Sequence, residues 1–233
     1  MKKRIWELDA FRGLCIIGVV LVHLIYDLVD LYEIVQWEYP GWFCFIRDWG
    51  GVLFLLLSGI CVTLGSRSVK RGTIVLCGGL LCTAATYFMW KNGFDSSIII
   101  YFGILHCLGV CMLLWPMYKS MSWWALLFHG LAFTAVGFLI AEINGPKPWM
   151  VALGFDFPGF ASSDYFPLLP NLGFFLIGAA LGRLIYKKKT SLLPCINEKT
   201  WFVRPFCFCG RHSLWIYLIH QPVLAGICYL LTL

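Results

Sequence analysis

Apolar residues form seven long runs along the chain, each separated from the next by a polar or aromatic segment. An α-helix needs about 20 such residues to cross a hydrocarbon core of about 30 Å. The pattern therefore predicts an all-α, polytopic membrane helix bundle of about seven transmembrane helices, built as a single membrane-embedded domain over residues 1–233. The predicted spans are Glu7 to Leu31, Trp49 to Ser66, Gly72 to Trp90, Ile98 to Met117, Trp123 to Ala141, Leu168 to Tyr186 and Ser213 to Leu231.

The composition excludes a soluble globular protein of this length. Of the 233 residues, 60% are hydrophobic and 13% are charged, which leaves too little polar surface to cover a globule in water. Most of the eleven cysteines lie inside predicted spans, where they are typical of buried thiols. Cys207 and Cys209 have a C-x-C spacing without a second pair of ligands, so we expect no metal site.

Charge alternates between the two sides of the predicted bundle. Of the 18 Lys and Arg residues, 15 fall on one side, including Lys2, Lys3, Arg4 and Lys199, and only Arg47, Lys91 and Lys147 fall on the other. Nine of the 12 acidic residues lie on the side with few cations. The positive-inside rule then places the N-terminus in the cytoplasm and the C-terminus outside. The same rule accounts for the net charge of +6, since the excess cations lie on one side of the membrane, where they meet membrane lipids. The charge therefore does not call for a nucleic-acid partner.

The first predicted helix carries a stripe of polar side chains. At about 100° per residue, its charged and histidine side chains share an arc of about 60°. Charged groups inside a span are costly and usually face a cavity or a partner, so we expect this stripe to line the interior of the bundle. The stripe consists of Asp9, Arg12, His23, Asp27 and Asp30.

His23 is the candidate general base of this stripe. Asp27 follows it by four residues, a spacing that lets a carboxylate reach and orient an imidazole on one helix face. Arg12 precedes His23 by 11 residues, or roughly 16 Å along a helix axis, which places it near the cytoplasmic end. The alternative is a histidine that serves packing or hydrogen bonding alone.

Two other predicted spans carry polar groups. His106 lies eight residues into the fourth span and is expected at a depth similar to that of His23, so that the two flank one cavity. Tyr217 and His220 fall on one face of the last span, with Gln221 adjacent. Isolated polar residues of this kind also make ordinary interhelical hydrogen bonds, and that interpretation stays open for both Tyr217 and His220.

An ordered set of motifs then runs along nearly the whole chain. The motifs are Glu7-Leu-Asp-Ala-Phe-Arg-Gly13 with His23 and Asp27, Leu57-Ser-Gly59, Phe102-Gly-Ile-Leu-His106, Asp164-Tyr-Phe-Pro-Leu-Leu-Pro170, and Gly210-Arg-His-Ser-Leu-Trp-Ile-Tyr-Leu-Ile-His-Gln-Pro222. The set resembles the bacterial proteins related to heparan-alpha-glucosaminide N-acetyltransferase. The spacing of Arg12 and His23 is also similar to the R-x10-H signature of the broader membrane acyltransferase group.

The resemblance implies a multi-pass enzyme of the bacterial plasma membrane. It would transfer an acetyl or short acyl group from cytoplasmic acetyl-CoA or another acyl-CoA to an extracytoplasmic acceptor, such as a sugar or amino sugar. We expect His23, Asp27 and His106 to be catalytic. We expect the donor to be bound by Arg12, Arg67, Lys70, Arg71 and Arg211, and the acceptor by Asp164, Tyr217 and His220. Whether the chain forms a homo-oligomer stays open.

Two other classes of function fit the same stripe. A proton-coupled transporter or channel would use Arg12, His23 and Asp27 as a relay or substrate path. No inverted repeat is evident in the sequence, which weighs against that class. A non-catalytic assembly protein that retains the fold is the third alternative.

Overall fold

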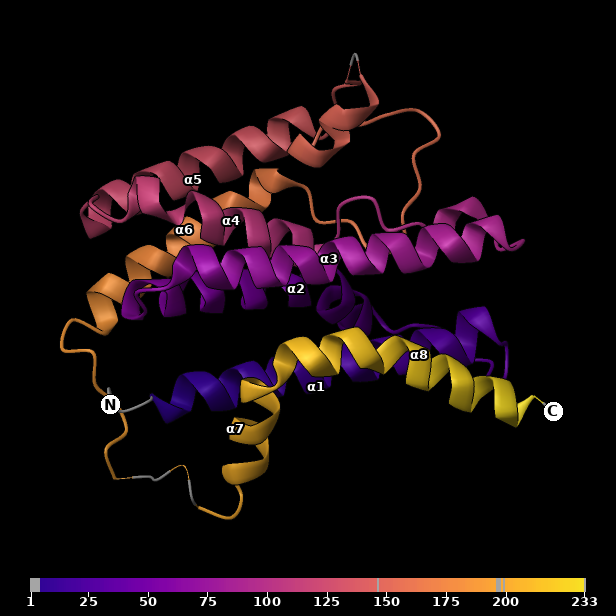
Figure 1. The fold of residues 1–233 in the computed structure, drawn as a ribbon, viewed down its shortest axis with the longest axis horizontal. Coiled ribbons are helices and arrows are strands. Elements are labelled where there is room, and N and C mark those ends of the chain that lie inside the picture. The colour runs from indigo at the N-terminus through magenta and orange to yellow at the C-terminus, as the bar shows by residue number, and fades with distance from the viewer. Residues whose placement is uncertain (1–4, 146, 196–197, 199, 233) are drawn as a thin grey trace. The chain divides into compact units, whose positions relative to one another are not determined.

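The chain is helical in the computed structural model, which describes residues 5–145, 147–195, 198 and 200–232 (Figure 1). Lys2, Lys3, Arg4 and Lys199 lie outside the described residues. The elements are α1 (Trp6–Tyr26), η1 (Asp27–Leu31), α2 (Gly41–Leu64), α3 (Ser68–Lys91), η2 (Ser96–Ile98), α4 (Ile104–Tyr118), α5 (Trp123–Ile140), η3 (Pro148–Leu153), α6 (Leu168–Ile185), α7 (Arg204–Arg211) and α8 (Ser213–Leu231).

The helices confirm an all-α, multi-pass membrane protein. Within the described ranges, six helical segments are long and apolar enough to cross a membrane. The fourth predicted span corresponds to α4, an apolar helix of 15 residues, which is shorter than a full crossing requires. Large apolar side chains on these helices are exposed, as lipid-facing positions are; they include Phe88, Phe128, Leu139 and Trp215.

The second span begins earlier than predicted. The sequence placed its start at Trp49, but α2 begins at Gly41, directly after Pro40. Arg47 and Asp48 precede the predicted start, but they belong to α2, where Arg47 Nε donates to Asp48 Oδ1 at 2.8 Å on the helix surface. Both charges lie on the exposed surface of α2, outside the apolar run that set the predicted start.

The fourth span begins later than predicted. Residues before α4 are extended, and the amide of Phe166 donates to the carbonyl of Phe102 at 2.9 Å. This pairing keeps Phe102 out of the helix, so α4 begins at Ile104. His106 therefore lies in the first turn of α4, and the prediction that it is eight residues inside a span is wrong.

The chain packs as two compact units. Unit 1 contains Met1–Phe54 and Lys188–Leu233, and unit 2 contains Leu55–Lys187. The division falls within α2. Unit 1 thus brings together the two ends of the chain, with α1, η1, α7 and α8, whereas unit 2 contains α3 to α6.

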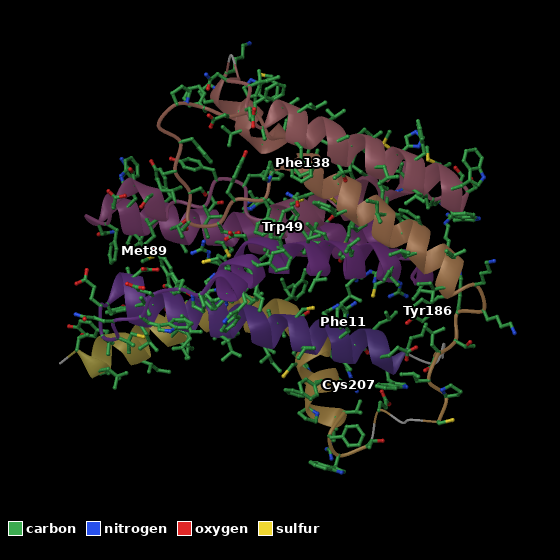
Figure 2. The ribbon with its side chains drawn as sticks, turned by 180° about the vertical axis from the view of Figure 1, so that it is seen from behind. Phe11, Trp49, Met89, Phe138, Tyr186 and Cys207 are labelled. Atoms are coloured by element: carbon green, nitrogen blue, oxygen red, sulfur yellow. The ribbon has the colours of Figure 1, made fainter. Side chains whose placement is uncertain are left out.

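In unit 1, α1 packs against α7 and α8 (Figure 1). The sequence had predicted a loop where the short helix α7 forms. Gly13 and Gly210 permit a close contact between α1 and α7, because a Cβ on Gly210 would lie 2.9 Å from the Gly13 nitrogen. Cys207 is buried where the two helices meet, and its thiol donates to the Trp6 carbonyl at 3.5 Å (Figure 2).

In unit 2, α3 packs against α4 and α5 packs against α6. Arg183, in the last turn of α6, donates to the backbone carbonyls of Lys119 and Met121. Its guanidinium also lies 5.8 Å from the centre of the Trp115 ring. Arg183 therefore holds the turn that joins α4 and α5. The core of this unit includes Leu55, Leu57, Val62, Cys107, Cys111, Leu126, Phe175 and Leu176.

Candidate functional site

The side chains of the predicted stripe on the first helix make separate contacts in unit 1. Near its start, Arg12 Nη1 donates to Asp9 Oδ1 at 3.2 Å, one turn away. At its far end, the Tyr39 hydroxyl donates to Asp30 Oδ2 at 2.6 Å. Burial and this bond with Asp30 raise the pKa of Tyr39 to about 12. The two ends of the stripe are thus engaged locally, and the middle carries His23 and Asp27.

His23 is half-buried, and its ring has a defined tautomer. Its Nδ1 lies 2.9 Å from the Val19 carbonyl oxygen. A carbonyl only accepts a hydrogen bond, so Nδ1 carries the proton and the lone pair of the neutral ring is on Nε2. His129 makes the same kind of bond to Ala125, at 2.8 Å, so this bond alone does not mark a functional histidine. The surroundings of His23 do distinguish it.

His220 of α8 packs against His23. The two ring centres are 4.8 Å apart and the rings are nearly perpendicular, at 87°. His220 is buried, and its Nδ1 lies 2.5 Å from the Tyr217 carbonyl oxygen. By the same reasoning, the lone pair of neutral His220 is on Nε2. The last span therefore brings a second imidazole to His23.

Asp27 is fully buried at the start of the π-helical turn η1, an element frequent at functional sites. Its two carboxylate oxygens accept from Gln221 Nε2 of α8, at 2.8 and 3.1 Å. The sequence predicted that Asp27 bonds to His23. Instead, the side-chain amide of Gln221 takes that place, because α8 presents it directly to the carboxylate.

Two buried acceptors in this cluster have no hydrogen-bond partner in the part of the chain that the structure describes. They are His220 Nε2 and Gln221 Oε1. The ring of Tyr217 packs beside His220, with the two ring centres 5.3 Å apart. We call His23, Asp27, His220 and Gln221 the polar cluster of unit 1. It combines a buried carboxylate with lone pairs from three other side chains.

Arg211, the last of the predicted donor-binding cations in unit 1, is paired with an acid. Its Nη2 lies 3.2 Å from Glu198 Oε2, and its Nε donates to the Cys207 carbonyl at 3.2 Å. Both charges of this pair are substantially exposed, with side-chain exposures of 33% and 40%. An exposed pair of this kind contributes little to stability.

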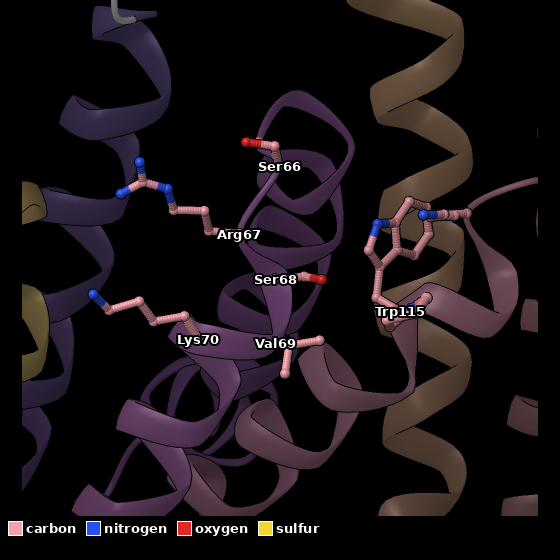
Figure 3. A pocket seen from close by; sticks show the side chains of 9 residues that line it. Ser66, Arg67, Ser68, Val69, Lys70 and Trp115 are labelled. Atoms are coloured by element: carbon pink, nitrogen blue, oxygen red, sulfur yellow. The ribbon is translucent and has the colours of Figure 1, made fainter.

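A basic pocket of about 430 Å³ lies in unit 2, at the turn from α2 to α3. Arg67 and Lys70 belong to it, together with Lys119 from the end of α4. Figure 3 shows Arg67 and Lys70 extending to one side of this turn, with Trp115 on the other. The pocket also includes the first residues of α3, and a helix N-terminus favours anions. Arg71 follows in the same turn, with its guanidinium against Gly65.

His106 has both ring nitrogens engaged in unit 2. The Gly103 amide donates to its Nδ1 at 3.2 Å, so the proton is on Nε2, which lies 3.3 Å from the Thr83 hydroxyl. That hydroxyl donates to the Ile100 carbonyl at 2.6 Å. His106 is also buried. These contacts join the start of α4 to α3 and leave no lone pair on the ring for a substrate.

Asp164 lies at the same end of α4. Its Oδ2 accepts from the Ile104 amide at 3.0 Å, in the first turn of the helix, where a negative charge is stabilised by the helix dipole. A Cβ on Gly103 would lie 2.7 Å from Asp164 Cγ, so this contact requires the glycine. The structure thus places Asp164 and His106 at the start of α4, in unit 2, and packs His23 against His220 in unit 1.

Three residues of these sites were missed as candidates. Gln221 was noticed only as a neighbour of His220, although an amide inside a span is itself a signal of a buried partner. Lys119 and Trp115 join the basic pocket only through the packing of α4 on α3. Their positions in the sequence, about 50 residues after Arg67, gave no signal of that contact.

The chain matches the family model described as heparan-alpha-glucosaminide N-acetyltransferase, catalytic, over residues 4–222. Searches of curated proteins and of solved structures found no match. The matched range includes the polar cluster of unit 1, the basic pocket of unit 2, and every predicted site residue.

Proposed function

Because the chain belongs to the heparan-alpha-glucosaminide N-acetyltransferase catalytic family, we propose that it transfers an acetyl or other short acyl group from cytoplasmic acyl-CoA to an extracytoplasmic acceptor. Its family makes it an acetyltransferase, and its long apolar helices make it a multi-pass membrane protein. The acceptor class that we propose is an amino sugar. We place the enzyme in a bacterial plasma membrane and treat residues 1–233 as one functional domain.

The observation that carries the proposal is the packing of His23 against His220, in the cluster that contains the buried Asp27. With Nδ1–H bound to the Val19 carbonyl, the lone pair on Nε2 is available as a general base. As the acceptor amine attacks the thioester, a C–N bond forms and the C–S bond breaks. Nε2 removes one proton from the nitrogen and passes it to the departing thiolate. The Val19 carbonyl then binds the charged ring more strongly than the neutral one.

Asp27 supports this base electrostatically. It lies one helical turn beyond His23, and Gln221 supplies the donor that a buried carboxylate requires. A negative charge at this distance stabilises the imidazolium that forms during attack. The role of Asp27 is therefore to favour the charged ring, whereas the Val19 carbonyl fixes the tautomer.

We propose that the basic pocket binds the phosphates of the donor. Arg67, Lys70 and Lys119 supply positive charge there, and the start of α3 supplies backbone donors. Arg12, Arg71 and Arg211 are further proposed cations for the same polyanionic donor. His106 has both nitrogens engaged, so its role in this proposal is to hold the start of α4.

A second candidate function is proton-coupled transport. It is favoured by the full burial of Asp27, whose hydrogen-bond partner among the described residues is an uncharged amide. A buried carboxylate without a cation is typical of proton pathways in membranes. Transport moves a proton or solute without forming a new covalent product, so product analysis separates the two functions.

The test uses purified protein in proteoliposomes, with acetyl-CoA labelled in its acetyl group and methyl α-D-glucosaminide as the acceptor. We expect labelled N-acetyl product and its loss in His23→Ala. Proton flux that is lost in Asp27→Asn, without any acetylated product from the wild-type protein, would favour the transporter instead.

A further inference from the structure

The polar cluster of unit 1 contains more hydrogen-bond acceptors than its own residues satisfy. His220 is 8% exposed, and its Nε2 has no partner in the described part of the chain. Gln221 Oε1, on the next residue, is also buried without a partner there. Buried polar atoms that lack a partner are rare in folded proteins, because each costs desolvation free energy. This pair is therefore available to a bound group that donates hydrogen bonds.

The position of the pair points to the acyl acceptor. His220 contacts the ring of His23, which is the base of the proposed reaction. With the ring centres 4.8 Å apart, a nucleophile bound at His23 is within reach of the His220 ring. Both imidazoles have Nδ1–H bound to a backbone carbonyl, at Val19 and Tyr217. Each ring therefore presents a lone pair, and neither presents a donor.

We infer that His220 is a substrate-binding residue that selects an amine over a hydroxyl, by accepting the second N–H of a primary amine while His23 accepts the first. This inference rests on the proposed function. In the reaction, one N–H proton goes to His23 and then to the thiolate of coenzyme A. The other N–H remains on the nitrogen of the amide product, so its bond to His220 Nε2 persists throughout.

An alcohol is unable to satisfy both rings. Its single O–H proton goes to His23 as attack begins, and the oxygen then has only lone pairs to present to His220. A site that is built to bind an N–H discriminates strongly against an analogue that lacks it, because the buried acceptor is left unpaired. Gln221 Oε1 adds a further acceptor on the face of α8 that contacts Asp27. We expect it to accept a hydrogen bond from a second donor of the substrate, next to the amine.

The test compares two probes, methyl α-D-glucosaminide and methyl α-D-glucoside, with acetyl-CoA as the donor. His220→Phe keeps a ring and removes the acceptor, whereas His220→Gln keeps an acceptor oxygen at a similar reach. We expect His220→Phe to lower the ratio of amine to hydroxyl acetylation by about tenfold or more, and His220→Gln to restore much of it. His129→Phe is the matched control, since His129 also bonds a carbonyl one turn back but lies among Tyr118, Phe128 and Phe133.

An unchanged ratio in folded His220→Phe would overturn the inference while leaving acyl transfer intact. If the wild-type protein acetylates neither probe, the proposed function fails. Equilibrium binding of the two probes to wild-type and His220→Phe protein then decides the inference separately. Tighter binding of the glucosaminide, lost in His220→Phe and retained in His129→Phe, supports it; equal binding of both probes by the wild type overturns it.

Discussion

Gln221 on α8 donates from its side-chain amide to both carboxylate oxygens of Asp27 on the first helical segment, at 2.8 and 3.1 Å. This contact joins residues that are 194 positions apart in the sequence. It also gives a fully buried carboxylate its hydrogen-bond donor. The pairing of the first and last spans in unit 1 therefore depends on a polar contact as well as on apolar packing.

Replacement of Gln221 tests this contact. Gln221→Leu leaves the Asp27 carboxylate buried without its donor, so we expect the free energy of unfolding to fall by about 1–3 kcal/mol. The double variant Asp27→Leu/Gln221→Leu should lose less than the sum of the two single variants, because neither polar group is then left unpaired. Equilibrium unfolding in mild detergent measures both. Strictly additive losses would show that the two residues do not interact.

The general base is tested by activity with folding monitored separately. We expect His23→Ala to lower kcat by about 10²- to 10⁴-fold while unfolding stays close to that of the wild type. Asp27→Asn should lower it less, because Asp27 stabilises the charged ring and does not remove the proton. His129→Ala is the control and should retain activity. A folded His23→Ala protein with unchanged turnover would remove His23 from the mechanism.

We expect replacement of His106 to lower stability and to spare turnover, the reverse of the effect expected for His23. His106→Ala leaves the Gly103 amide without its acceptor and removes the link to Thr83. We expect a loss of about 1–3 kcal/mol in the free energy of unfolding. The activity of the protein that remains folded should be largely retained. A large fall in kcat at unchanged stability would instead return His106 to the catalytic residues.

Donor binding is tested with coenzyme A alone. Lys70→Ala and Lys119→Ala each remove a cation from the basic pocket, so we expect each to raise Kd by about tenfold, with a larger effect at low salt. Arg12→Ala should also weaken binding. Asp164→Ala, at the start of α4, should leave Kd unchanged. Titration calorimetry in detergent measures all four, and a loss of affinity confined to Asp164→Ala would contradict the donor site.

The predicted orientation is tested by thiol labelling. Cys195 is exposed in the segment between α6 and α7, which the charge bias places in the cytoplasm. A variant with Cys195 as its single cysteine should react with an impermeant maleimide in inside-out vesicles and not in intact cells. A single cysteine introduced by Lys147→Cys should show the reverse.

Cys207 provides the control for this labelling. Burial raises the pKa of its thiol, which lowers the fraction of reactive thiolate at neutral pH. Its sulfur also lies against the backbone of α1. A single-Cys207 variant should therefore label slowly from either side. Labelling of Cys195 in intact cells would reverse the assignment of the two faces.

The all-α class and six of the seven predicted spans followed from the sequence in the described part of the chain, because a membrane-crossing helix requires a run of apolar residues whose length is set by the bilayer. The fourth predicted span corresponds to α4, which has 15 residues. The last predicted span matches α8 at both ends, from Ser213 to Leu231. Hydrophobic patterning misplaced the starts of α2 and α4. At α2, the helix extends beyond its apolar run through exposed charged residues. At α4, backbone pairing with the distant Phe166 keeps Phe102 out of the helix.

The sequence also identified His23, Asp27, Tyr217 and His220 as polar groups on helix faces, because helical periodicity is a local property. Their partners were decided by tertiary structure. Asp27 lies one turn from His23, yet it bonds to Gln221, and His23 packs on His220. Spacing along one helix fixes which side chains share a face. Which of them meet depends on the neighbouring helix, whose position is set by packing over the whole unit.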